Sequence, residues 1–178
     1  MHTITSKSGK TITLRPPTLA DTQIMLDYIN TIGREDIYVN VNPNDLYTFE
    51  QEQKFVSDII KKIKYRQQVY YLAFHHNLLI GSCSISKGQR RRKRIGIFGI
   101  TLSKDFRSDG IGRRLSEYTI KNSHDLLNLK IITLTVFAAN QPAIDMYQKL
   151  GFKQYGLLPR GLSYQDGYID EVMMYKNL

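Results

Sequence analysis

The chain is poor in the features that would stabilise it covalently or attach it to a membrane. Its 178 residues include one cysteine and no tryptophan. The single Cys83 excludes an intramolecular disulfide and leaves no thiolate cluster for zinc. No apolar run approaches the roughly 18 residues that a bilayer requires, and Met1–Ser6 lacks the pattern of a secretory signal. We therefore expect a soluble, cytoplasmic protein without a membrane partner, held together by its own apolar core.

Acidic residues are also scarce. The chain has 16 Asp and Glu against 25 Lys and Arg, a formal charge of +9. Residues 87–114 alone hold ten basic residues and two acids, so the remainder is nearly neutral. Such an imbalance indicates an anionic partner rather than a particular fold. The length suits one domain over residues 1–178.

The hydrophobic period changes along the chain from helical to strand-like and back, without repeats or linkers. Helices begin at capping patterns, among them Thr48-x-x-Gln51 and Asn140 with Pro142, and we expect Gly33 and Gly151 to end two of them. Strands are predicted over 11–15, 69–74, 78–85, 95–102, 130–137, 152–158 and 168–175, and helices over 18–32, 48–64, 110–125 and 140–150. This order predicts an α/β fold with one mixed sheet flanked by helices.

A glycine turn joins the strand ending at Leu102 to the following helix. Its N–H groups, the positive end of the helix dipole and nearby Arg107, Arg113 and Arg114 favour a phosphate. A P-loop would require Lys and then Ser or Thr after the last glycine, and a Rossmann turn would require a third glycine at position 115. The turn fits neither motif. The alternative is that it binds no anion and that its glycines serve only the backbone geometry of the turn.

The turn resembles the coenzyme A pyrophosphate loop of the GNAT-type N-acetyltransferases. Arg107-x-x-Gly110-x-Gly112 corresponds to the family's R/Q-x-x-G-x-G/A motif. The segment 133–152 resembles the family's next strand, Asn-capped helix, Tyr and Gly-Phe block at the right spacing. The resemblance covers roughly residues 95 to 155. It implies a single GNAT-like domain with a mostly antiparallel sheet of about seven strands and about four helices, using acetyl-CoA as co-substrate.

The resemblance also implies site residues. Tyr147 would be the general acid that protonates the departing thiolate, and a phenol is protonated at neutral pH. Asn140 would face the cofactor arm besides capping its helix. The resemblance assigns cofactor binding to Ile100, Thr101, Leu102, Arg107, Ser108, Asp109, Gly110, Ile111, Gly112, Arg113 and Asn140. The alternatives are that Asn140 is only a cap and Tyr147 only a core aromatic.

No general base stands out in the sequence. The strand 95–102 contains no acid, so the candidates are Glu35, Asp36, Asp170 and Glu171. For each we weigh a structural role, such as a cross-strand pair of Asp170 with Arg160. The resemblance implies a primary amine as the acceptor, and a small molecule and a protein N-terminus or lysine are both left open. Tyr38, Tyr47 and Tyr164 are candidates to shape its pocket within the loop 33–46 and the final hairpin.

The basic segment from Lys87 to Arg94 supports a rival function. It is either a nucleic-acid patch, in a binding module rather than an enzyme, or a solvated loop beside the 3′-phosphate of coenzyme A. We favour the second, because no RNA- or DNA-binding motif accompanies it. His75 and His76 fit a solvated turn better than a metal site, and Cys83 fits a buried apolar position. A homodimer is left open.

Overall fold

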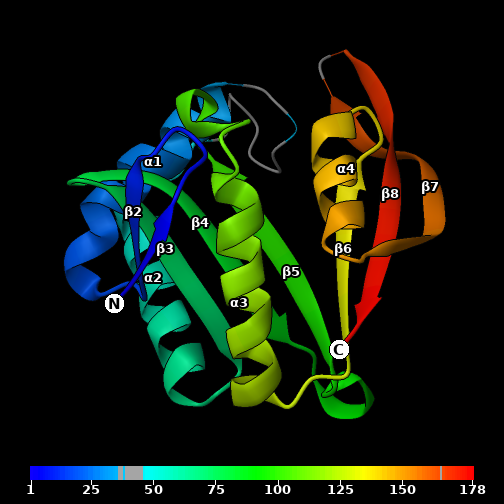
Figure 1. Ribbon diagram of the computed structural model, residues 1–178, viewed down its shortest axis with the longest axis horizontal. Coiled ribbons are helices and arrows are strands. Elements are labelled where there is room, and N and C mark those ends of the chain that lie inside the picture. Colours follow the sequence, from blue (N-terminus) through cyan, green and yellow to red (C-terminus); the bar gives the residue numbers. More distant parts are fainter. Residues whose placement is uncertain (36–37, 39–45, 165) are drawn as a thin grey trace.

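An eight-stranded sheet forms the framework of the computed structural model, which describes residues 1–35, 38, 46–164 and 166–178 (Figure 1). The strands follow the order β1-β2-β3-β4-β5-β6-β8-β7. Every neighbouring pair is antiparallel except β5 and β6. Their bounds are β1 His2–Thr5, β2 Thr11–Arg15, β3 Gln68–His75, β4 Leu78–Lys87, β5 Ile95–Leu102, β6 Ile131–Phe137, β7 Lys153–Tyr164 and β8 Gly167–Asn177. The α/β class with a mixed, mostly antiparallel sheet is confirmed, with eight described strands where about seven were expected.

The strand that the sequence analysis missed is β1. It has only four residues and pairs with β2 from His2 opposite Leu14 to Thr5 opposite Thr11. A strand this short carries too little alternation to be distinguished from a loop, because its pairing partner supplies most of what stabilises it.

Four α-helices flank the sheet: α1 Thr22–Arg34, α2 Phe49–Lys64, α3 Ile111–Leu127 and α4 Gln141–Lys149. The predicted caps form, since Thr48 and Gln51 make a reciprocal capping box and Asn140 accepts from the Ala143 N–H. Thr18 caps a short 3₁₀ turn that precedes α1. Gly33 does not end α1, contrary to the prediction. It is buried inside the helix, where packing outweighs a propensity cost of about 1 kcal/mol.

The two faces of the sheet bury separate apolar clusters. One cluster packs α3 and α4 against the sheet and includes Ile85, Leu115 and Ile132. The other packs α1 and α2 against the opposite face and includes Met25, Val56 and Leu72 (Figure 1). No helix in the described ranges is long and apolar enough to cross a membrane.

Candidate active site

The central feature of the site is the separation of β5 from β6. The two parallel strands pair only from Ile95 opposite Ile131 to Ile97 opposite Thr133. Beyond Ile97 they diverge (Figure 1), and the β5 edge from Phe98 to Leu102 has no partner in β6. Gly96 lies at the start of this divergence, where a Cβ atom would come within 2.7 Å of Ile85 and Leu129. The glycine is therefore required by close packing.

A cavity of about 1510 Å³ occupies this opening. Its walls include Tyr28, Glu52 and Tyr70 from the α1/α2 face, and also Gly112 and Tyr147 from the α3/α4 face. One cavity thus reaches from one face of the sheet to the other. Most of the site residues expected from the sequence line this cavity: Ile100, Thr101, Leu102, Arg107, Ser108, Gly110, Gly112, Arg113, Asn140 and Tyr147.

The glycine turn lies at one mouth of this cavity. Gly110 is the N-cap of α3 with φ +78°, and Ser108 also has a left-handed backbone with φ 64°. Left-handed residues at a helix start turn successive N–H groups toward one point and so form an anion-binding concavity. At Gly112 a Cβ would lie 3.3 Å from the Met146 sulfur of α4, so this glycine lets the two helices approach closely.

The missed β1–β2 hairpin holds the turn in place. Asp109 accepts hydrogen bonds from the Ser8 N–H at 2.8 Å and from the Ser8 hydroxyl at 2.6 Å, and it pairs with Lys10 at 3.1 Å. These donors, the Ser8 hydroxyl first, hold the pKa of Asp109 well below its usual range. Lys7 lies over Gly110 and lines the cavity, which adds a cation that the sequence analysis did not assign to the site.

We expect Asp109→Asn to weaken acetyl-CoA binding about tenfold, because the amide cannot accept all three bonds and the turn loses its anchor. Isothermal titration with acetyl-CoA measures this. The matched control is Asp105→Asn, an exposed acid four residues earlier. Equal affinities for the two variants would contradict a positioning role for Asp109.

Arg107 directs its guanidinium away from the turn. Its Nε donates to the Leu102 carbonyl at 2.9 Å, and its Nη2 pairs with Glu35 at 2.7 Å. The pair ties the end of β5 to the end of α1. Arg113 pairs with Glu117 on the exposed side of α3 at 2.9 Å. The role of both arginines toward a phosphate stays a prediction, and Glu35 is occupied by an ion pair.

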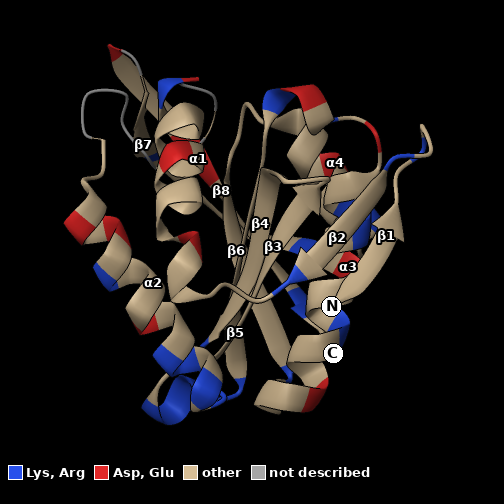
Figure 2. Ribbon diagram, turned by 90° about the vertical axis from the view of Figure 1, so that its left-hand side faces the viewer, with Lys and Arg blue, Asp and Glu red and all other residues tan. Residues whose placement is uncertain are grey.

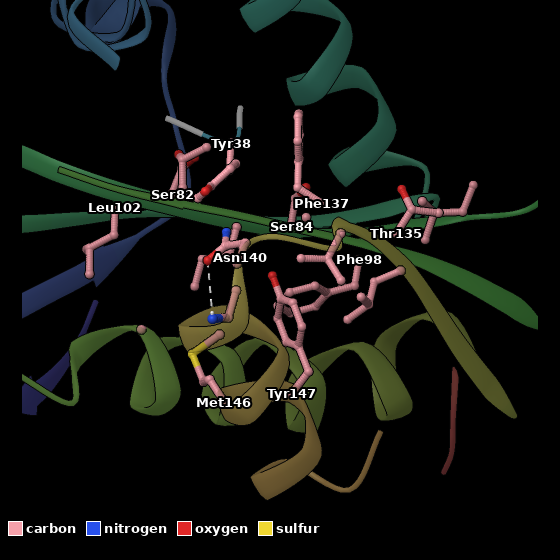
Figure 3. Close-up of a pocket in the computed structure, with 18 of the residues that line it drawn as sticks. Tyr38, Ser82, Ser84, Phe98, Leu102, Thr135, Phe137, Asn140, Met146 and Tyr147 are labelled. Atoms are coloured by element: carbon pink, nitrogen blue, oxygen red, sulfur yellow. Dashed lines mark hydrogen bonds between the residues drawn. The ribbon is translucent and has the colours of Figure 1, made fainter. Parts of the chain in front are cut away.

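Tyr147 is held among aromatic rings on the α3/α4 side of the opening. Its ring contacts Phe98 and Phe152 edge-on with centroids 5.8 and 5.9 Å apart. Figure 3 shows its hydroxyl pointing toward the strands near Asn140. No described residue hydrogen-bonds this hydroxyl. Burial raises the pKa of Tyr147, so the phenol stays protonated over the physiological range.

Four hydroxyl groups line the cavity on the α1/α2 side. Tyr70 donates to Ser82 at 3.2 Å, Ser82 and Thr101 share a bond of 3.1 Å, and Tyr28 donates to Thr101 at 3.0 Å. The chain connects β3, β4, β5 and α1 across the sheet. It forms only in the folded protein, because its members lie far apart in sequence.

Glu52 lies beside this chain and was not among the sequence candidates. It is 3% exposed and lines the cavity. Burial is the main cause of the raised pKa of Tyr70, and the charge of Glu52 adds to it. No described residue pairs with its carboxylate. Burial raises the pKa of Glu52 to about 7. A buried carboxyl that has no partner among the described residues and titrates near neutrality is suited to accept a proton or to bind a cation.

The other candidate acids differ in their surroundings, since one has a structural partner, one lines the cavity and one lies outside the described residues. Asp170 accepts from the Arg160 main-chain N–H at 2.9 Å, whereas the sequence analysis suggested a side-chain pair. Glu171 lines the cavity. Asp36 falls outside the described residues.

Of the three candidate pocket tyrosines, Tyr38 and Tyr47 line the cavity. Tyr164 stacks on Tyr38, with ring centroids 5.5 Å apart. Both rings also contact Phe137. The three aromatic side chains therefore form one cluster, which joins residues from three separate parts of the chain.

The basic segment 87–94 lies at the wrong end of the sheet to flank the glycine turn. It joins β4 to the start of β5, while the turn follows the end of β5. Eight extended residues separate them by about 25 Å. Gly88 and Arg92 of this segment nevertheless line the cavity, so its interpretation as a loop beside the coenzyme phosphates stays a prediction.

His75, His76 and Cys83 do not line the cavity. His76 forms the β3–β4 turn with φ 52°, and no metal-binding group of three or more ligands occurs among the described side chains. Cys83 is 1% exposed, and burial raises the pKa of its thiol to about 12, which confirms a buried, unreactive position.

Comparison with known proteins places this geometry in a family. The model of the acetyltransferase (GNAT) family matches residues 35–152. An L-amino acid N-acetyltransferase of Escherichia coli K12 is 34% identical over 97 residues, 51% of this chain and 59% of that protein. The chain thus matches less than two thirds of that curated relative.

Solved structures agree in fold. The GNAT-family acetyltransferase of Streptococcus pneumoniae superposes with a TM-score of 0.86 at 28% identity, covering 94% of this chain and 99% of that one. The ribosomal-protein-S5-alanine acetyltransferase of Vibrio fischeri has a TM-score of 0.83 at 19% identity, covering 98% and 97%. The family match spans well over half the sequence, and the chain belongs to the acetyltransferase (GNAT) family.

Proposed function

We propose that the protein is an N-acetyltransferase that transfers the acetyl group of acetyl-CoA to a primary amine by direct attack in a ternary complex. The observation that carries this proposal is the single cavity that passes through the sheet where β5 and β6 diverge. Two substrates can enter from opposite faces and meet there, which holds the reacting atoms together before any covalent step.

The cofactor enters from the α3/α4 side. The N–H groups of the turn 107–113 and the α3 dipole bind the pyrophosphate. The unpaired β5 edge at Ile100, Thr101 and Leu102 offers main-chain groups to the amides of the pantetheine arm, as an added strand would use them. Asn140 caps α4 and lines the same cavity.

The amine enters from the α1/α2 side, where we assign Glu52 the role of proton acceptor. As an ammonium ion, the acceptor is held by the Glu52 carboxylate and gives up one proton to it, through the hydroxyl chain or directly. The free amine nitrogen then attacks the thioester carbon. The C–S bond breaks, its electron pair goes to sulfur, and Tyr147 supplies a hydrogen bond and a proton to the departing thiolate. The second proton of the attacking nitrogen is lost as the amide forms and restores the Tyr147 phenol, while the proton taken up by Glu52 passes to solvent.

The acceptor class that we favour is an α-amine of an amino acid or of a protein N-terminus. One buried carboxyl at 3% exposure suits one ammonium group. The curated relative acts, by its name, on L-amino acids, and the Vibrio fischeri protein on an alanine of ribosomal protein S5.

The test is a thermal-shift titration followed by a thiol-release assay. Acetyl-CoA at about 100 times its Kd adds about 2.7 kcal/mol, which raises the Tm by roughly 5–10 °C for a chain of this size. Thiol release is then compared among L-amino acids, short peptides with free N-termini and spermidine. An unchanged Tm in millimolar acetyl-CoA would overturn the proposal, whereas release only with spermidine would overturn the acceptor class alone.

A further inference from the structure

The end of the molecule farthest from the glycine turn carries a surface of one charge. Three segments meet there: the last turn of α2 with residue 66, the β4–β5 loop, and residue 130 before β6. The Lys87 N–H donates to the Gln67 carbonyl at 2.7 Å, and the Lys130 N–H donates to the Arg94 carbonyl at 2.9 Å. Figure 2 shows the blue residues gathered at the lower end of α2 and beneath β5. We call this surface the basic end; it comprises Lys61, Lys62, Lys64, Arg66, Lys87, Arg90, Arg91, Arg92, Lys93, Arg94 and Lys130.

The charges of the basic end are not neutralised within the described part of the chain. None of its eleven residues forms an ion pair there, and ten of them are exposed. Its segments contain no acid. The neighbouring Asp58 and Asp125 are paired with Lys54 and His124 instead. The rest of the chain has 14 Lys and Arg against 16 acids, so the basic end accounts for the whole excess of positive charge.

Arg92 lines the cavity, but neither stability nor binding of the pyrophosphate at the glycine turn accounts for the whole arrangement. Like charges in proximity destabilise the fold, and about 25 Å of β5 separates the basic end from the glycine turn. Arg66 and Arg90 also have left-handed backbones with φ 54° and 51°. That conformation costs a residue with a Cβ about 1 kcal/mol and favours glycine or asparagine. Arginine at both positions indicates that its side chain is needed.

We propose that the basic end binds single-stranded RNA. Exposed Arg and Lys side chains with no partner are the groups that neutralise a phosphate backbone. Tyr65 lies among them at 68% exposure, as a platform on which an unpaired base can stack, and arginine guanidinium planes stack in the same way. An acidic peptide supplies anionic groups but no base to stack on this ring.

Fluorescence anisotropy with a labelled 20-nucleotide single-stranded RNA tests the proposal on the full chain. For about five phosphate contacts, the Kd should rise roughly 100-fold between 50 and 200 mM salt. Arg91→Glu combined with Arg94→Glu should weaken binding at least about tenfold at 100 mM salt and flatten the salt dependence. Tyr65→Ala should weaken it about tenfold with the salt dependence retained.

The matched control is Lys54→Glu combined with Lys121→Glu, which changes the net charge equally at exposed positions outside the basic end. It should bind RNA within about twofold of the wild type, and this small loss measures the effect of net charge alone. Acetyl-CoA binding should be unchanged in all variants, which also verifies folding. Equal loss in both double variants would overturn the proposal. So would equal or tighter binding of single-stranded DNA of the same sequence, of polyglutamate or of phosphatidylserine vesicles.

Discussion

Replacing Tyr147 by phenylalanine is expected to lower kcat roughly 100-fold while the affinity for acetyl-CoA stays within about twofold. The hydroxyl lines the cavity without a partner among the described residues, so its removal leaves no group unsatisfied. The ring remains packed against Phe98 and Phe152. The loss therefore reports on proton donation to sulfur rather than on packing. Single-turnover thiol release at saturating acetyl-CoA measures it.

The leaving group separates this role from a structural one. An acetyl thioester of a more acidic thiol needs less protonation, so the difference between wild type and Tyr147→Phe should shrink with it. Tyr168→Phe is the matched control, because Tyr168 is 69% exposed and does not line the cavity. An unchanged kcat in Tyr147→Phe, or a defect independent of the leaving group, would be incompatible with a general acid.

The second large effect is expected from Glu52→Gln. In the wild type, kcat/KM should rise with pH through the Glu52 pKa of about 7, because only the carboxylate accepts a proton. Glu52→Gln should lower kcat/KM about 100-fold above pH 7 and remove this limb of the profile. Glu50→Gln is the control, since Glu50 is an exposed acid in the same helical turn. A profile that keeps its limb near pH 7 in Glu52→Gln would exclude Glu52 as the proton acceptor.

The Glu52 carboxyl should also make the stability of the protein depend on pH, in the direction opposite to activity. Burial raises the Glu52 pKa from 4.5 to about 7, so folding favours the neutral form. The free energy of unfolding therefore falls as pH rises from about 4.5 through 7, by up to ~3 kcal/mol from this group. The Tm of Glu52→Gln minus that of wild type should increase by roughly 5 °C or more between pH 4.5 and 8.5. A difference that stays constant with pH would contradict a buried titrating carboxyl.

Stability and activity thus vary in opposite directions at this residue. If Glu52→Gln is more stable and less active than the wild type at alkaline pH, the buried Glu52 carboxylate serves activity and lowers the stability of the fold. The pH profile of kcat/KM tests whether Glu52 accepts the proton, and the Tm difference tests whether its carboxyl titrates while buried. Either hypothesis can therefore fail without the other.

Local patterns in the sequence were sufficient for most helices, strands and caps. The box of Thr48 and Gln51, the cap at Asn140 and the turn at Gly110 involve neighbours within a few residues, so sequence alone contains them. The strand 95–102 was also predicted with its observed bounds. Exceptions were β1, which needs a partner strand, and Gly33, whose burial outweighs its propensity.

The composition of the cavity was decided only by the tertiary structure. Glu52 became a candidate when α2 packed over the strands that carry Tyr70 and Ser82, and Asp109 gained its role from a hairpin about a hundred residues earlier. The excess of positive charge was visible in the sequence, but the convergence of the end of α2, the β4–β5 loop and Lys130 into one basic surface was not. Sequence fixes which side chains neighbour one another within a turn or a strand. Burial, pKa and surface charge depend on contacts between distant segments, which exist only after folding.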